Sequence, residues 1–256
     1  MQIELILFFF LIAVIYASAG FGGGSSYLAV MALWSIEMAA MRTTSLLCNI
    51  VVVAGGTWIF WKNGHLRWRR ILPLCIASVP LAFLGGAVPL KETTFFLLLG
   101  SSLVLAALLL LFKQPSGDTF SDISAEKKES KMQPNDTVVS GALGGSIGLL
   151  SGMVGIGGGI FLSPCLNLLR WDAPKNIAAT ASFFILVNSI SGLAGQLWQH
   201  KFTPNWAFTL PLLVAVLAGG QIGSRLSALK LKQNQVRQAT AILVLYAGIN
   251  ILWMHW

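Results

Sequence analysis

Charged residues are scarce in this chain. Only 10% of its 256 residues are charged, whereas a soluble domain typically carries about 25%. Hydrophobic residues make up 55% of the chain, and its mean hydropathy is +0.75. This composition excludes an ordinary soluble domain and predicts an all-α protein that crosses a membrane several times.

Carboxylates are missing from the middle of the apolar segments. Those nearest to such segments lie at their ends: Glu4, Glu37, Glu92 and Asp172. A carboxylate inside the membrane is the usual proton relay of a transporter, and none is expected here. The three cysteines lack metal-ligand spacing, and no mid-span nucleophile has a neighbouring base. We therefore expect neither an enzyme nor a bound metal or other cofactor.

The apolar residues form a series of separate segments. They cover residues 3–19, 25–35, 43–61, 71–90, 94–112, 137–154, 160–169, 177–198, 207–228 and 238–254. A membrane span needs about 20 apolar residues, so the pattern predicts about eight full spans. Segments 25–35 and 160–169 are too short to span. Each follows a glycine run of the form Gly-x-Gly-Gly-Gly, at 20–24 and 155–159, so we expect two broken helices that continue as half-helices.

The two glycine runs belong to a longer internal repeat. At one constant spacing, matching residues recur in the same order: Thr43 and Thr180, Ser45 and Ser182, Gly55 and Gly192, Trp61 and Trp198. Such order indicates a duplication. We therefore expect repeat 1 at 1–112, a flexible polar loop at 113–136 and repeat 2 at 137–256.

Basic residues indicate how the two repeats are oriented. If each broken segment returns to its own side, the repeats are inverted, and fourteen Lys and Arg residues share one side against three on the other. The fourteen are Lys62, Arg67, Arg69, Arg70, Lys113, Lys127, Lys128, Lys131, Arg170, Lys175, Arg225, Lys230, Lys232 and Arg237. The other three are Arg42, Lys91 and Lys201. Parallel repeats would divide them nine to eight. Basic residues concentrate on the cytoplasmic side, so the pattern favours inversion with both termini outside. The net charge of +8 is explained by topology, and no nucleic-acid partner is expected.

The glycine runs are the best candidates for a substrate site. Broken helices at matching points of two repeats mark the binding site in many transporters. A half-helix that begins there directs free N–H groups and the positive end of its dipole at the break, which favours an anion. The alternative is close helix packing through small residues spaced four apart. We expect packing for Gly144, Gly148, Gly152, Gly219 and Gly223, and a site for the two triple-glycine runs.

Neutral polar residues near the breaks complete the candidate site. Hydroxyl and amide groups can bind an oxyanion without carrying charge, although many such groups only join helices. The candidate substrate-binding residues are Gly22, Gly23, Gly24, Ser25, Thr43, Ser45, Asn49, Gly157, Gly158, Gly159, Thr180, Ser182, Asn188 and Arg225. The residues after the breaks differ: Ser25 and Tyr27 in the first copy, Ile160 and Leu162 in the second. The two half-sites are therefore not equivalent, and an asymmetric ligand is plausible.

These features resemble the TauE/SafE family of sulfite exporters, also called the toluene-sulfonate uptake permease family. The resemblance rests on the duplicated glycine runs, on Pro164 after the second run, and on the segments Thr43-Thr44-Ser45 and Ala179-Thr180-Ala181-Ser182. It covers the chain except for the loop 113–136. The first copy has no proline that matches Pro164. The resemblance implies movement of small sulfur-containing or organic anions such as sulfite or sulfonates.

Together these observations predict a secondary transporter of small anions that works by alternating access. An anion channel and a non-transporting membrane scaffold remain alternatives. The expected partners are a small anionic substrate and the lipid bilayer, with a homo-oligomer as a possibility. The expected location is a bacterial inner membrane.

Overall fold

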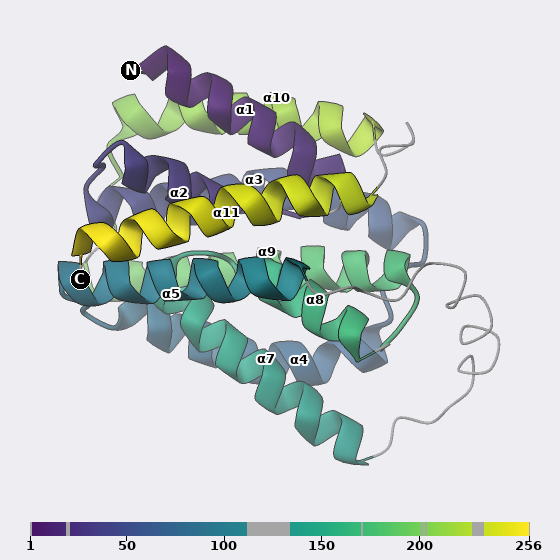
Figure 1. Ribbon diagram of the computed structural model, residues 1–256. Helices are drawn as coiled ribbons and strands as arrows, with labels where there is room; N and C mark the ends of the chain where they lie inside the picture. Colours follow the sequence, from purple (N-terminus) through teal and green to yellow (C-terminus); the bar gives the residue numbers. More distant parts are fainter. Residues whose placement is uncertain are drawn as a thin grey trace.

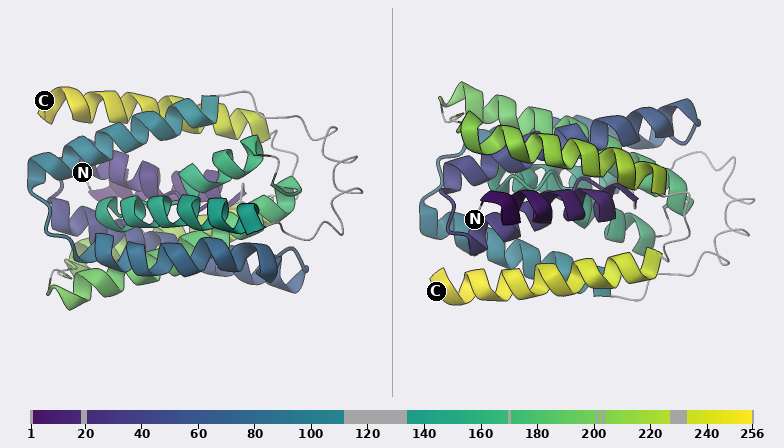
Figure 2. Two further views of the ribbon diagram at one scale, coloured as in Figure 1. Left: turned by 90° about the horizontal axis from the view of Figure 1, so that it is seen from below. Right: turned by 90° about the horizontal axis from the view of Figure 1, so that it is seen from above.

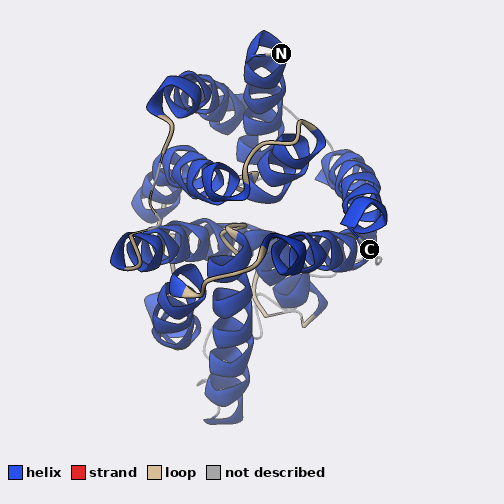
Figure 3. Ribbon diagram, turned by 90° about the vertical axis from the view of Figure 1, so that its left-hand side faces the viewer, coloured by secondary structure: helices blue, strands red, loops and turns tan. Residues whose placement is uncertain are grey.

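The computed structural model describes residues 2–18, 21–111, 134–169, 171–200, 202, 204–226 and 233–255. Within these ranges the chain is helical, with turns and loops but no strand (Figure 3). The helices are α1 (Gln2–Ser18), α2 (Gly24–Leu33), α3 (Met38–Lys62), α4 (Trp68–Ala87), α5 (Glu92–Leu111), α7 (Pro134–Val154), α8 (Gly159–Leu168), α9 (Pro174–Trp198), α10 (Trp206–Leu226) and α11 (Gln233–His255). The all-α expectation is confirmed for the described part of the chain.

Six of these helices are long and apolar enough to cross a membrane: α3, α4, α5, α7, α9 and α10. The short segments expected after the glycine runs are the ten-residue helices α2 and α8. The described apolar parts of α1 and α11 are also short, at Ile3–Ala17 and Ala241–His255, so a total of eight spans stays a prediction. Most of the predicted loop 113–136 lies outside the described residues. Helix α7 begins at Pro134, and the division into two repeats joined by a loop stays a prediction.

The helices form two groups, and each group draws on both halves of the chain. Helices α1, α2 and α3 pack with α10 and α11, and we call these five the first group. Helices α4 and α5 pack with α7, α8 and α9, and these form the second group. In Figure 1 the first group lies above the second. The groups meet along α3 with α9 and along α5 with α11.

Helix directions follow from the residues that meet at these contacts. Thr43 near the start of α3 bonds to Gln196 near the end of α9, so these two helices are antiparallel. Helices α5 and α11 are antiparallel as well, because a Cβ on Gly100 would meet Leu252 and one on Gly248 would meet Val104. Figure 2 shows α5 and α11 along one flank of the molecule, with the start of α1 and the end of α11 at the same end.

Glycines allow close packing within each group, as the sequence predicted. Cβ atoms on Gly144, Gly148 and Gly152 of α7 would overlap the backbone of α4. On α10, Gly219 and Gly223 face the backbone of α1 in the same way. Backbones can approach this closely only where side chains are absent. These glycines therefore hold α7 against α4 and α10 against α1.

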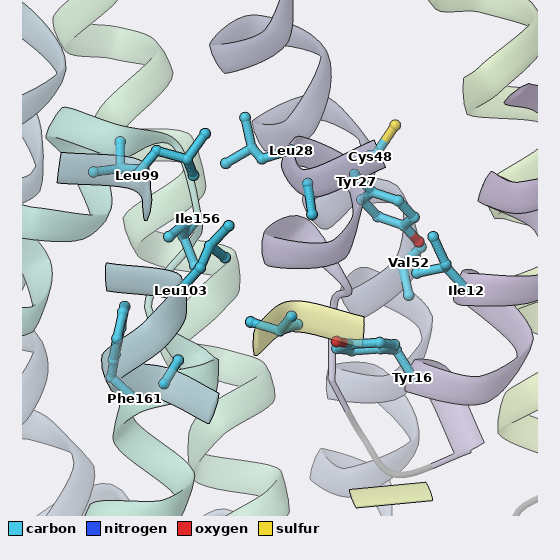
Figure 4. Packing of buried hydrophobic residues seen from close by; sticks show 14 of the residues in the cluster. Ile12, Tyr16, Tyr27, Leu28, Cys48, Val52, Leu99, Leu103, Ile156 and Phe161 are labelled. Atoms are coloured by element: carbon cyan, nitrogen blue, oxygen red, sulfur yellow. The ribbon is translucent and has the colours of Figure 1, made fainter. Parts of the chain in front are cut away.

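Buried apolar side chains fill both groups. Figure 4 shows this packing on both sides of the contact between the groups. One side carries Ile12, Tyr16, Tyr27, Leu28, Cys48 and Val52, and the other carries Leu99, Leu103 and Phe161. Ile156, from the second glycine run, is buried among them at 3% exposure. The irregular backbone of this run is thus enclosed by protein, as a membrane interior requires.

Candidate functional site

Each half-helix begins at a glycine in the left-handed region of backbone space. Gly23 precedes α2 with φ 84°, and Gly158 precedes α8 with φ 85°. A residue with a side chain is disfavoured there by about 1–2 kcal/mol. The first N–H groups of α2 and α8 have no carbonyl partner within their own helix. Both predicted helix breaks are confirmed, and both N-termini are buried.

The two breaks touch one another where the two groups meet. A Cβ on Gly24 would lie 2.6 Å from the carbonyl oxygen of Ile156. Only a glycine permits this approach of the first run to the second. Runs that are far apart in the sequence are therefore neighbours in space, and the N-terminal ends of both half-helices lie close to their contact.

Two side chains of α3, Ser45 and Asn49, bridge the breaks. The Ser45 hydroxyl donates to the carbonyl oxygens of Gly24 (3.1 Å) and Gly155 (2.9 Å). The Asn49 amide Nδ2 donates to the carbonyl of Ile156 at 3.0 Å. Because Nδ2 is held there, Oδ1 is directed at the first run, 2.5 Å from where a Cβ on Gly22 would lie. The Gly155 and Ile156 carbonyls follow the last residue of α7, and these bonds give them partners that no helix supplies.

Helix α9 faces the second run with different chemistry. A Cβ on Gly157 would lie 3.0 Å from Ile185 Cγ2 and 3.1 Å from Ser189 Oγ. A Cβ on Gly159 would overlap the Ile185 side chain. Ile185 thus takes the place at the second run that Asn49 takes at the first. The packing contacts of the two runs therefore differ, and the non-equivalence of the two half-sites stays a prediction.

Several buried polar atoms around the breaks have no hydrogen-bond partner. They are Tyr27 Oη, Asn49 Oδ1, Ser151 Oγ and Ser189 Oγ. Each lies beside one of the run glycines: Tyr27 beside Gly23, Asn49 beside Gly22, Ser151 beside Gly158 and Ser189 beside Gly157. A buried polar group without a partner costs about 1–3 kcal/mol. Such atoms collect where a ligand or water completes the bonding.

The other predicted site residues are more scattered. Ser25 is buried at the start of α2. Thr43 donates to Gln196 Oε1 at 2.9 Å, whereas Thr180, its repeat counterpart, donates to Asn176 of its own helix. Asn188 likewise donates within its helix, to the carbonyl of Phe184, and leaves Oδ1 without a partner.

Ser182 and Arg225 are the remaining predicted site residues. Ser182 is buried in α9, with its hydroxyl 4.0 Å from where a Cβ on Gly56 would lie. Arg225 belongs to α10, but its side chain lies outside the described residues. The structure therefore brings Ser45, Asn49 and the six run glycines together, and it leaves Thr180 and Asn188 with partners in their own helix.

Arg42 is a feature that the sequence reasoning undervalued. The sequence pattern placed Arg42 at the end of an apolar segment, yet Arg42 is only 4% exposed. Its Nη2 donates to the carbonyls of Gly85, Gly86 and Gly152 at 3.2–3.4 Å, and its Nε has no partner. One signal was available: Arg42 is the only charged residue between Glu37 and Lys62, and it directly precedes Thr43. An ionisable residue within a membrane span is a functional candidate by default.

A cluster of charges lies away from the breaks, between the α3–α4 and α8–α9 connections. Asp172 Oδ2 is 3.3 Å from Arg67 and 3.6 Å from Arg70. Its Oδ1 accepts from the backbone N–H of Ala173 and from Asn176 Nδ2. These contacts join the start of α4 to the residues just before α9.

The geometry around the breaks suits a small anion. Two helix N-termini supply backbone donors and positive dipole ends, and nearby hydroxyl groups can add further donors. No cluster of three or more His, Cys, Asp or Glu residues that could hold a metal occurs in the described ranges. The residues at the breaks are thus suited to binding through neutral donors.

The chain is similar to known membrane transporter proteins. The model of the family described as "Sulfite exporter TauE/SafE" matches residues 5–251. A "Probable membrane transporter protein y4hK" of Sinorhizobium fredii is 34% identical over 98% of both chains. A "Probable membrane transporter protein" of Xylella fastidiosa is 23% identical over 92% of this chain and 89% of its own. The "Probable membrane transporter protein MamO" of Paramagnetospirillum magneticum is 24% identical over 84% of this chain and 38% of its own. No solved structure gives a significant match.

Proposed function

The chain belongs to the sulfite exporter TauE/SafE family, and from that premise we propose that it is a secondary transporter of small sulfur-containing or organic anions. The observation that carries the proposal is the meeting of the α2 and α8 N-termini at one buried point. Helix N-termini that meet inside a membrane bind anionic groups in other transporters. The proposed contacts are the run glycines, with Ser25, Ser45 and Asn49, and with Thr43, Thr180, Ser182, Asn188 and Arg225 lining the path.

We propose further that the two halves are inverted repeats. Two observations support this. Counterpart helices α3 and α9 meet in antiparallel directions, and so do α5 and α11, as an axis in the membrane plane requires. The ion pairs of Asp172 with Arg67 and Arg70 join two connections that parallel repeats would put on opposite sides. Each broken segment then returns to its own side, and the protein is a multi-pass component of a bacterial inner membrane.

Alternating access is the mechanism that this architecture favours. Each group contains one broken helix, and the broken helices meet where the groups meet. Rocking of one group against the other would expose that point first to one side and then to the other. An anion channel would use the same point without alternate closure. A non-transporting scaffold would bind no anion there.

Binding is tested first, with purified protein and a thermal-shift series of sulfite, methanesulfonate, sulfate and acetate. We expect sulfite or a sulfonate to raise the unfolding temperature of the native protein. Gly158→Leu should remove that response, because the side chain would occupy the N-terminus of α8 beside Phe184 and Ile147. Gly141→Ala is the matched control, since its Cβ meets only the Pro73 carbonyl at 3.9 Å. An unchanged response in folded Gly158→Leu protein would refute the site.

Transport is tested next, with radiolabelled sulfite in proteoliposomes. A secondary transporter is expected to show saturable flux that changes with an imposed proton or sodium gradient and that is accelerated by unlabelled anion on the far side. A channel would show flux that follows the membrane potential alone. Flux no faster than that of protein-free liposomes, for all four anions, would count against both.

A further inference from the structure

Four polar side chains on one short stretch of α3 reach from the first group into the second. Arg42 donates to carbonyls of α4 and α7, and Thr43 donates to Gln196 of α9. Ser45 donates to Gly155, and Asn49 donates to Ile156. We call Arg42, Thr43, Ser45 and Asn49 the α3 latch. All four lie on the half of α3 that begins at Met38, so the latch joins the two groups from that end of α3 as far as the breaks.

The counterpart stretch of α9 keeps a threonine and a serine, Thr180 and Ser182, but it lacks the arginine and the asparagine. The repeat spacing that pairs Thr43 with Thr180 places Ala179 at the counterpart of Arg42. Thr180 donates to Asn176 of its own helix at 2.8 Å. Ile185 takes the place of Asn49 beside the second run, and it has no polar atom. The contact between the groups is thus strongly polar at the end where α3 begins. At the end where α9 begins, it has no counterpart of Arg42 or Asn49.

We propose that the α3 latch is the gate on the side of the membrane where α3 begins, and that the structure shows this gate closed. The inference rests on the proposed alternating access. Opening this side requires the two groups to separate along α3 and α9. The latch bonds are the ones that must break, and they re-form each time the transporter closes on that side.

Arg42 is the positioning residue of this gate. Its guanidinium contacts carbonyls in the last turns of α4 and α7, where the negative ends of both helix dipoles lie. No carboxylate among the described residues pairs with it. A buried cation held only by carbonyls is compensated while the groups are closed, and it regains water when they part. Such a contact stabilises the closed state without locking it.

Cross-linking of neighbouring residues tests the gate. In a chain with its three native cysteines replaced by alanine, Leu46→Cys is combined with Gly192→Cys, which joins α3 of the first group to α9 of the second. A Cβ on Gly192 would lie 3.4 Å from Leu46 Cδ1, and neither residue belongs to the proposed anion site. The matched control combines Thr44→Cys with Thr209→Cys, because these residues are bonded at 3.1 Å within the first group. A short cleavable bifunctional thiol reagent is applied, and radiolabelled sulfite flux is measured before and after reduction.

We expect the Leu46–Gly192 cross-link to abolish flux until it is reduced, and the Thr44–Thr209 cross-link to spare it. If the first cross-link spares flux, or if both abolish it, the gate proposal is overturned. This comparison needs a functioning transporter, so a second measurement is made without any anion.

Spin labels report the gate whether or not sulfite is the substrate. Glu37→Cys with Trp198→Cys places exposed labels across the two groups at the latch end, and Glu37→Cys with Trp206→Cys places them within the first group. Arg42→Gln should shift the first pair toward longer distances and leave the second pair unchanged. Arg42→Lys, which keeps the charge, should give a smaller shift. An unaltered Glu37–Trp198 distribution in Arg42→Gln protein would overturn the gate even if sulfite flux is absent from the native protein.

Discussion

Asn49 holds the second glycine run from a helix of the other group. Its Nδ2 donates to the carbonyl oxygen of Ile156 at 3.0 Å, and its Oδ1 stays unpaired beside Gly22. One amide therefore contacts both breaks. Since both breaks belong to the proposed anion site, Asn49 links binding at that site to the contact between the groups.

Replacement of Asn49 should weaken the fold and the response to anions together. Asn49→Ala leaves the Ile156 carbonyl buried without its donor, which costs about 1–3 kcal/mol. Thermal unfolding in detergent should show a lower midpoint and a smaller sulfite-induced shift. Asn167→Ala is the control, because Asn167 bonds only within α8. Equal effects of the two changes would argue against a special role for Asn49.

Glycines with positive φ should tolerate replacement by alanine to different degrees, depending on how tightly their surroundings pack. Gly158→Ala and Gly64→Ala both place a side chain at positive φ, at about 1–2 kcal/mol each. At Gly158 the Cβ would also lie 2.9 Å from Phe184 Cε1, whereas nothing lies within 4 Å of it at Gly64. Gly158→Ala should therefore lower the unfolding temperature more than Gly64→Ala. The reverse order would contradict the tight packing of the second break.

Helix packing in the second group should depend on Gly148. Its Cβ would lie 2.5 Å from the Ser78 carbonyl, so Gly148→Ala must push α7 away from α4, at about 1–3 kcal/mol. Gly141 lies two turns earlier, where a Cβ would meet only the Pro73 carbonyl at 3.9 Å. Gly141→Ala should therefore be neutral or slightly stabilising. Size-exclusion chromatography of fluorescent fusions after a heating series would measure both. A Gly148→Ala protein as heat-resistant as Gly141→Ala would refute the contact.

Topology can be measured by labelling single cysteines in intact cells. With inverted repeats, Arg69→Cys and Lys175→Cys are expected on one side of the membrane and Lys91→Cys on the other. All three positions are exposed at helix ends. A membrane-impermeant maleimide, applied before and after permeabilisation, separates the two sides. Labelling of residues 69 and 175 from opposite sides would exclude inversion and would conflict with the Arg67–Asp172 ion pair.

Local features of this fold were predictable because they depend on neighbouring residues. Three consecutive glycines after an apolar stretch stop a helix, so α2 and α8 were expected close to their observed starts. Glycines spaced four apart in α7 and α10 likewise predicted close packing. Such patterns need no knowledge of the partner helix, because a backbone without side chains can approach any other backbone.

Features that depend on distant contacts were not predictable in the same way. Asn49 was a candidate, but its contact with Ile156 joins residues more than a hundred positions apart. Arg42 was placed at a segment end because α3 was expected to begin at residue 43. In the structure α3 begins at Met38, which carries the guanidinium to the last turns of α4 and α7. A one-turn difference in the start of a helix decided between an interfacial cation and a buried one.

Each helix group combines helices from both halves of the chain, which has a consequence for biosynthesis. The first group needs α10 and α11, and the second needs α7, α8 and α9. Neither group can be complete when the first half of the chain has left the ribosome. Helices α4 and α5 enter the membrane before their partners α7, α8 and α9 are synthesised. Helix α1 can pack against α10 only near the end of synthesis. A nascent chain stalled after α5 therefore exposes surfaces that only the remaining helices can cover.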